Sequence, residues 1–261
     1  MHGNGHWGWV APSDHDPGGN HVPENMQTKT LKSDFLLLVA AFLWGTTFVA
    51  QRKGMDHLGP MMYNALRFAV GAATLVPILL LFRTNGRPDC HRGRPFLLCG
   101  GVLAGLALFG GASMQQMGLV YTTAGKASFI TSLYVVLVPI VGLFLGHRCG
   151  LTVWVGATLA VAGLYLLSVR ESLAIGRGDL LVLIGAVFWT VHVLLIDYLA
   201  KRTDPLRLAC IQFVACSVLS LLAAIPFERT TLPAVGAAAI PILYAGVFSA
   251  GIAFTLQIVC Q

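Results

Sequence analysis

One arginine lies deep within an otherwise apolar stretch of the chain. Arg67 is the only charged residue more than three positions from the end of a long apolar run, and Asn64 precedes it by about one helical turn. A guanidinium in apolar surroundings needs a partner, which could be an anionic ligand, a carbonyl of a neighbouring helix or water in a cavity. Snorkelling of the long side chain to a membrane surface is the alternative. Arg67 therefore predicts a ligand site, a structural polar network or a surface anchor.

Aromatic and polar side chains recur at similar depth in other apolar runs. Trp44 and Trp189 could offer aromatic faces to an apolar or cationic ligand, or could serve only in packing. His192 titrates in a range that would suit proton coupling, but it could equally be a neutral histidine bonded to a neighbour. The remaining binding candidates are polar side chains within apolar runs: Gln116, Ser128, Thr131, Gln212 and Gln257.

Ser128 and Thr131 share one helical face and precede Pro139, which can kink a helix and free a carbonyl. The commoner fate of such hydroxyls is a hydrogen bond back to their own helix. No Asp or Glu lies deep in an apolar run, and the sequence contains no HExxH, GxSxG or complete P-loop motif. We therefore expect no catalytic residue, metal or cofactor, and hence no enzyme.

The amino-acid composition indicates whether these residues lie in a soluble or a membrane protein. Of the 261 residues, 56% are hydrophobic and only 11% are charged, and the mean hydropathy is +0.74. Soluble domains carry about 25% charged residues. A soluble enzyme, a disordered protein and a nucleic-acid-binding protein are therefore disfavoured, and the net charge of +6 fits basic cytoplasmic loops. We expect an all-α polytopic protein with the lipid bilayer as its partner.

Apolar runs alternate with short polar breaks from Phe35 onward. A helix needs about 20 apolar residues to cross the hydrocarbon core. The predicted membrane spans are 35–52, 61–82, 96–117, 126–146, 150–169, 179–199, 206–227 and 236–259. With the N-terminus in the cytoplasm, ten Lys and Arg residues fall on the cytoplasmic side of these spans and six on the other.

The first 33 residues differ from the rest of the chain. They contain four of the eight His residues and show no apolar periodicity, so we expect 1–33 to be a disordered extension. The segment beginning MQTKTLKSDF is an ordinary basic lead-in to a membrane helix, which favours Met26 as the native start.

An internal repeat relates the two halves of the chain. An offset of 145 places Trp44 over Trp189 and Pro60 over Pro205, and an offset of 141 places Gln116 over Gln257. The first repeat, 34–169, holds five spans, so its copy must enter the membrane from the opposite side. The second repeat, 179–261, holds three. The pattern predicts an inverted repeat with eight of ten expected spans.

Four segments carry a family resemblance. They are AAFLWGTTFVAQRKGMDHLGP (40–60), NALRF (64–68), AGKASFITSLYVVLVPIVG (124–142) and GAVFWTVHVLLIDYLAKRTDP (185–205). Over 34–261 the chain resembles the EamA family of the drug/metabolite transporter superfamily. The resemblance implies ten spans in two inverted five-helix halves, a central substrate cavity and movement of small metabolites, often amino acids, across the bacterial inner membrane. The chain departs from the family by lacking spans nine and ten.

We therefore expect a secondary transporter that moves small organic metabolites by alternating access. A truncated, non-transporting fragment or partner subunit is the alternative, and an intramembrane enzyme for lipid-linked substrates is disfavoured because clustered acids are missing. The GxxxG spacings Gly101–Gly105 and Gly142–Gly146 predict close helix packing within the chain first, and a homodimer contact second.

Overall fold

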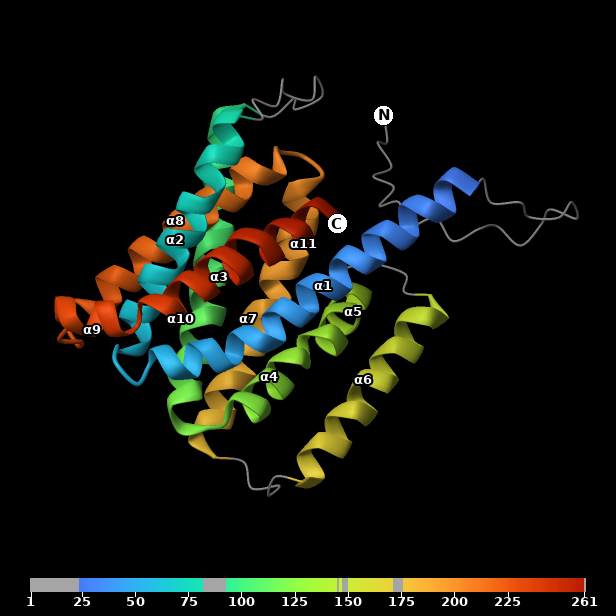
Figure 1. The fold of residues 1–261 in the computed structure, drawn as a ribbon. Helices are drawn as coiled ribbons and strands as arrows, with labels where there is room; N and C mark the ends of the chain where they lie inside the picture. The colour runs from blue at the N-terminus through green and yellow to red at the C-terminus, as the bar shows by residue number, and fades with distance from the viewer. Residues whose placement is uncertain (1–23, 82–92, 145, 147–149, 171–175, 261) are drawn as a thin grey trace, which may run out of the picture.

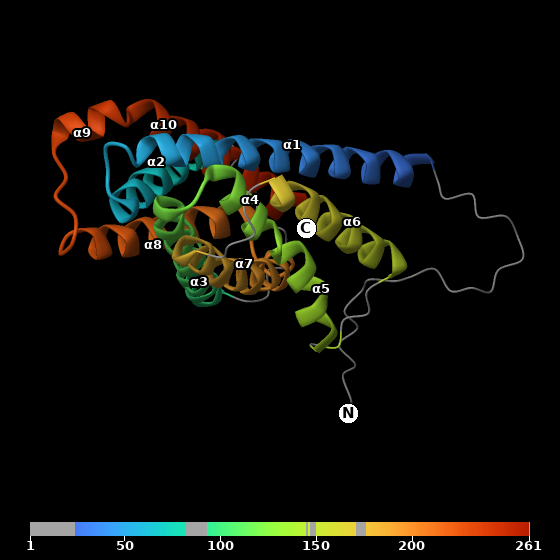
Figure 2. The same cartoon turned by 90° about the horizontal axis from the view of Figure 1, so that it is seen from below.

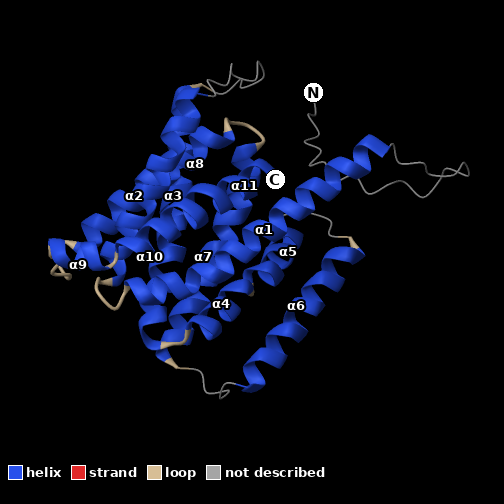
Figure 3. Ribbon diagram, viewed as in Figure 1, coloured by secondary structure: helices blue, strands red, loops and turns tan. Residues whose placement is uncertain are grey.

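The computed structural model describes residues 24–81, 93–144, 146, 150–170 and 176–260. Every regular element in these ranges is a helix (Figure 3), as expected for an all-α membrane protein. The helices of the first half are α1 (Glu24–Gly54), α2 (Pro60–Leu81), α3 (Arg94–Tyr121), α4 (Ala124–Ser132), α5 (Tyr134–Phe144) and α6 (Leu151–Arg170). Those of the second half are α7 (Arg177–Ala200), α8 (Pro205–Ala224), α9 (Leu232–Ala237), α10 (Ala239–Tyr244), the π-helix η1 (Ala245–Ala253) and α11 (Phe254–Cys260).

Seven of the described segments are long and apolar enough to cross a membrane. They match seven of the eight predicted spans. The eighth, predicted at 150–169, is helix α6, whose described apolar stretch runs only from Leu151 to Gly163. Large apolar side chains such as Phe42, Leu80 and Phe144 are exposed on the outside of the bundle, as expected of a surface that faces lipid.

The N-terminal boundary differs from the prediction. Helix α1 begins at Glu24, so the expectation of disorder is wrong for 24–33. This segment contains no Gly or Pro and consists largely of good helix formers, so the helix can extend beyond the apolar run. Residues 1–23, with the four N-terminal His, lie outside the described residues.

Two predicted spans are interrupted helices. The span at 126–146 divides into α4 and α5 at Leu133, while Pro139 lies within α5. The last span divides into α10, η1 and α11. The sequence of η1 is apolar or small at almost every position, so its hydrophobic pattern does not predict a π-helix. Both interruptions occur where the helices border the cavity described below.

Close helix crossings rely on glycine. The helices α3 and α7 cross so closely that a Cβ atom added at Gly118 would lie 2.6 Å from the carbonyl oxygen of Gly178. The Gly101–Gly105 motif faces α8, where added Cβ atoms would meet Ile211 and Ala215. The prediction of intramolecular packing is therefore confirmed for this motif. Small residues at such crossings let backbones approach and gain van der Waals contact in lipid.

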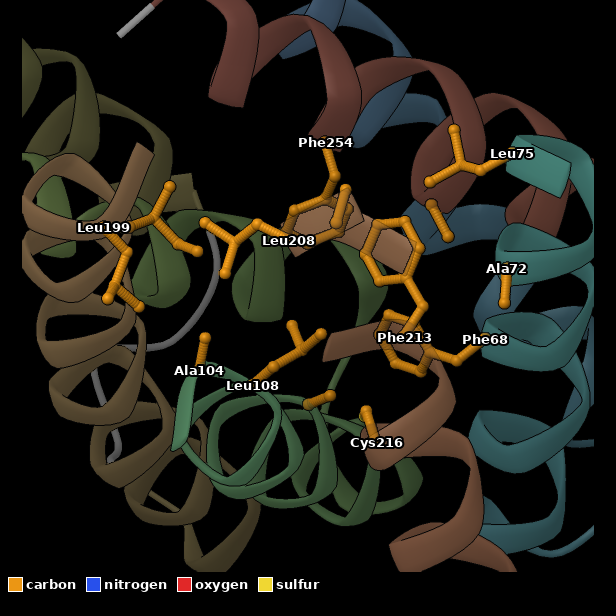
Figure 4. Close-up of a cluster of buried hydrophobic side chains, with 14 of the residues drawn as sticks. Phe68, Ala72, Leu75, Ala104, Leu108, Leu199, Leu208, Phe213, Cys216 and Phe254 are labelled. Carbon is orange, nitrogen blue, oxygen red and sulfur yellow. The ribbon is translucent and has the colours of Figure 1, made fainter. Parts of the chain in front are cut away.

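One pair of residues matched by the predicted repeat, Pro60 and Pro205, lies at corresponding helix starts. Pro60 and Pro205 each begin a helix, α2 and α8, which pack against each other. The rings of Phe68 and Phe213 lie 5.9 Å apart at this contact. Figure 4 shows them pointing toward each other, beside Phe254, in the main apolar core. In Figure 2, α1 and α10 lie along one face of the bundle and α3 and α7 along the opposite face. In Figure 1, α6 lies at the edge of the bundle, next to α5.

Candidate functional site

A cavity of about 300 Å³ lies among helices from both halves of the chain. Helices α1, α4 and α5 line it from the first half, together with single residues of α2 and α3, and α7, η1 and α11 line it from the second. Its wall is mainly apolar, with a few polar groups. This is the usual character of a small-molecule site, and the volume is at the lower end of the range for such sites.

Gln115 is the centre of the polar network in the cavity wall. Its Oε1 accepts hydrogen bonds from Nε1 of Trp189 at 3.0 Å and from Oγ1 of Thr131 at 3.5 Å. Its Nε2 donates to Oε1 of Gln51 at 3.2 Å. The amide of one residue thus joins α1, α3, α4 and α7 around the cavity.

Aromatic rings form the apolar part of the wall. Phe254 stacks on Trp189 with ring centroids 5.6 Å apart and meets Trp44 edge-on at 5.2 Å. Phe48 and Tyr134 complete this surface. The two tryptophans, which the repeat predicts to be equivalent, therefore lie in the same cavity and share one aromatic neighbour.

Arg67 places a positive charge at the cavity. The residue is 3% exposed, and its guanidinium carbon lies 4.6 Å from the ring centroid of Phe68. Its Nε has no hydrogen-bond partner, and no ion pair to Arg67 is formed within the described part of the chain. The side chain is not a snorkelling anchor, because it is buried against the cavity.

Six of the ten predicted site residues line the cavity: Trp44, Arg67, Ser128, Thr131, Trp189 and Gln257. Ser128 and its neighbour Ser132 donate to carbonyls three residues earlier in their own helix, as the commoner alternative predicted. Thr131 instead reaches Gln115 on α3.

The other four predicted residues lie in the protein core, away from the cavity lining. Nε2 of His192 and Oε1 of Gln212 are 2.9 Å apart in a buried pair. Asn64 and Gln116 are completely buried, and neither side-chain amide has a hydrogen-bond partner.

Several cavity residues are missing from the predicted set. The predicted repeat pairs Gln116 with Gln257 and so favours Gln116 as a cavity residue. In the structure Gln115, not Gln116, lines the cavity. Adjacent residues on a helix point about 100° apart, so only one of the two glutamines can face it. Gln51, next to the charged end of α1, and Ser249, within the π-helix, carried no periodic signal. Phe254 was hidden among other apolar residues of its span.

Polar contacts join four helix ends close in sequence to the cavity residues Gln51 and Ser128. Nζ of Lys126 lies 2.6 Å from Oδ2 of Asp179, and the hydroxyl of Thr122 donates to Oδ1 of the same carboxylate at 2.7 Å. Nearby, Nη1 of Arg52 donates to the carbonyls of Leu119 and Val120 at 3.0 and 3.2 Å. These contacts join the C-terminal ends of α1 and α3 to the N-terminal ends of α4 and α7. We refer to Lys126 and Asp179, with these supports, as the end clamp.

Comparisons with known proteins agree with this architecture. An uncharacterized transporter of Archaeoglobus fulgidus is 33% identical over 193 residues, which cover 74% of this chain and 58% of that protein. The uncharacterized inner membrane transporter YedA of Escherichia coli K12 is 27% identical over 194 residues, which cover 72% of this chain and 60% of YedA. The chain thus spans less than two thirds of the length of these relatives.

A solved crystal structure has the same fold, with a TM-score of 0.68 at 24% sequence identity over 88% of this chain and 79% of that one. The model of the EamA-like transporter family matches residues 31–169 and 176–260, two segments that correspond to the two predicted repeats. Taken with the multi-pass helical bundle, these matches show that the chain belongs to the EamA-like transporter family of membrane proteins.

Proposed function

We propose that this protein is a secondary transporter that carries small organic metabolites through the cavity by alternating access. The observation that carries the proposal is the cavity itself, because both halves of the chain line it and polar groups occur in an otherwise apolar wall. A transporter that rocks one half against the other needs its binding site where the halves meet.

The helix contacts support an inverted relation between the predicted repeats, 34–169 and 179–261. Helix α3 packs on α7 and α8, and η1 packs on α1 and α2. If α1 is exchanged with α7, α2 with α8 and α3 with η1, each set of contacts becomes the other. The contact between α2 and α8 is unchanged by that exchange, as expected at the axis of a two-fold relation.

The end clamp is the proposed gate of the transporter. Asp179 is nearly buried and is held by Lys126, Thr122 and the backbone nitrogen of Gly176, which donates at 2.8 Å. Alternating access requires this end to open when the opposite end closes. The clamp is built from polar contacts between separate helices, which can be broken and formed again without unfolding a helix.

Transport is tested with the purified full chain in proteoliposomes. Uptake of a panel of labelled metabolites is measured with and without a pH gradient, and empty liposomes give the background. We expect saturable uptake of at least one metabolite. A folded, monodisperse protein that moves no member of the panel would contradict the proposal and favour the alternative of a fragment or partner subunit.

The gate is tested by cross-linking in a variant without native cysteines. The pair Lys126→Cys and Asp179→Cys places one cysteine on α4 and one on α7. Linking the two thiols with a short bifunctional reagent should abolish uptake. If they are linked by a disulfide instead, a reducing agent should restore uptake. The matched control is Asp197→Cys with Lys201→Cys, an ion pair of the same 2.6 Å length at the C-terminal end of α7. Full transport with the clamp cross-linked would overturn the gating role.

The proposal also places the protein in the bacterial inner membrane with its N-terminus in the cytoplasm. The excess of basic residues on one side of the spans and the name of the relative YedA support this placement. A reporter fused after Gln261 should then be cytoplasmic, since the predicted number of spans is even. An extracytoplasmic reporter would overturn the orientation.

A further inference from the structure

Among the fully buried polar atoms of the described cavity residues, the two without a hydrogen-bond partner are donors, Nε of Arg67 and Nε1 of Trp44. Arg67 carries a full positive charge, and Nε1 of Trp44 is buried without a partner. The equivalent nitrogen of Trp189 is already bonded to Gln115. Both oxygen and nitrogen of Gln115 are engaged, so this residue has no strong demand for a ligand.

Within the described part of the chain, no negative charge at the cavity balances the arginine. None of the described residues that line the cavity is an Asp or Glu. The ion pairs of the described residues join Lys126 to Asp179, Lys201 to Asp197 and Arg207 to Asp204. A buried guanidinium without a carboxylate is costly to the protein, so the site favours a ligand that brings the missing charge.

The remainder of the wall indicates what is attached to that charge. Trp44, Trp189 and Phe254 form a continuous aromatic surface, and Phe48 and Val193 extend it. An ammonium group would meet no carboxylate here and would be repelled by Arg67. The wall therefore suits an apolar or aromatic body that has no amino group.

We propose that the substrates are amphipathic organic monoanions, namely small acids with one carboxylate and an apolar or aromatic body. Arg67 and the indole nitrogen of Trp44 bind the carboxylate, and the aromatic surface binds the body. Charge-assisted hydrogen bonds to a guanidinium are strong and directional, which makes the acid group the main determinant of selection. This inference rests on the proposed transport function, because the cavity is taken as the transport site.

The test measures binding separately from transport. Calorimetric titration of the detergent-solubilised full chain uses 3-phenylpropionate, its neutral amide 3-phenylpropionamide, and phenylalanine, which adds an amino group to the same skeleton. We expect the acid to bind at least about ten-fold more tightly than either of the other two probes. Equal affinities for the acid and the amide, or tighter binding of phenylalanine, would overturn the proposal.

Substitution of Arg67 distinguishes a ligand-binding role of this residue from a structural one. We expect Arg67→Met to lose at least about ten-fold in affinity for 3-phenylpropionate while its melting temperature stays the same or rises, because the unpaired buried charge is removed. Arg67→Lys, which keeps the charge, should retain part of the affinity. The matched control is Arg207→Met, at an exposed arginine on α8, which should leave the affinity unchanged.

The outcomes separate the two proposals. A lower melting temperature in Arg67→Met, with unchanged affinity for the acid, would assign Arg67 a structural role and overturn the inference. Selective binding of the acid by a protein that transports none of it would support the inference about the cavity and contradict the transport function instead.

Discussion

Nε1 of Trp189 donates a hydrogen bond to Oε1 of Gln115 at 3.0 Å, whereas the equivalent nitrogen of Trp44 has no partner. The predicted repeat offers a reason for this asymmetry. An offset of 141 maps Gln115 onto Leu256, which has no amide to offer Trp44. The two tryptophans that the predicted repeat pairs therefore differ: Nε1 of Trp189 is bonded in the cavity wall, whereas Nε1 of Trp44 is the donor that we propose for the ligand.

Replacement of the central amide should loosen the cavity wall. Gln115→Leu removes the partner of Trp189, Thr131 and Gln51 at once, and leaves polar atoms of these residues unpaired. Interhelical hydrogen bonds in membrane proteins contribute about 0.6 kcal/mol each, with larger values at fully buried groups, so we expect a loss of about 1–2 kcal/mol in stability. A thermal melt followed by size-exclusion chromatography measures it.

The neighbouring glutamine supplies the control for this experiment. Gln116 is completely buried, and neither atom of its amide has a partner. Gln116→Leu removes an unsatisfied polar group, so the melting temperature should stay the same or rise. If Gln116→Leu destabilised the protein as much as Gln115→Leu, the network around Gln115 would not be the source of the effect.

The sequence alone predicts the spans because lipid imposes a simple rule on composition: each crossing requires a continuous apolar helix. The side of the helix on which a polar residue lies is harder to predict, as the two glutamines show. In a soluble helix the apolar stripe identifies the inner face. In α3 nearly every position is apolar or small, so the pattern could not distinguish Gln115 from Gln116.

The same limit applies to Arg67 and His192. Both are buried polar residues in apolar runs, and both were candidates for the site. Only Arg67 reaches the cavity, while His192 pairs with Gln212 in the core. The difference arises from packing between helices, α2 with η1 and α7 with α8, which the apolar pattern within a single helix does not encode.

A carboxylate from the second half stabilises the start of α2. Oε1 and Oε2 of Glu228 accept hydrogen bonds from the backbone nitrogens of Met61 and Met62, each at 2.8 Å. A negative charge at a helix N-terminus also interacts favourably with the helix dipole. We expect Glu228→Ala to lower stability by about 1–2 kcal/mol in the same thermal melt.

The adjacent Arg229 is exposed and provides the control. Arg229→Ala should leave the melting temperature unchanged. Gly59→Ala is a second test of the contact, because an added Cβ would lie 2.2 Å from the carboxyl carbon of Glu228 and would displace it. Wild-type stability in both Glu228→Ala and Gly59→Ala would show that this contact does not hold the two halves together.

The crossing of α3 and α7 should tolerate no added methyl group. A Cβ at Gly118 would lie 2.6 Å from the oxygen of Gly178, and one at Gly178 would lie 2.7 Å from the oxygen of Gly118. Because these neighbours are backbone atoms, the helices themselves would have to separate. Overpacking of this kind costs about 1–3 kcal/mol, so we expect Gly118→Ala to lower the melting temperature clearly. The crossing also sets the distance between Gln115 and Trp189, so the same variant should bind ligand more weakly.

Gly163→Ala on α6 is the matched control, since nothing lies within 4 Å of its added Cβ. Alanine is the better helix former, so this variant should be as stable as the wild type or slightly more so. The double variant Gly118→Ala with Gly178→Ala should cost less than the sum of the two single changes, because the first methyl group already forces the helices apart. Strictly additive losses would mean that each glycine acts through its own helix, and that the close approach of α3 and α7 does not position the wall of the cavity.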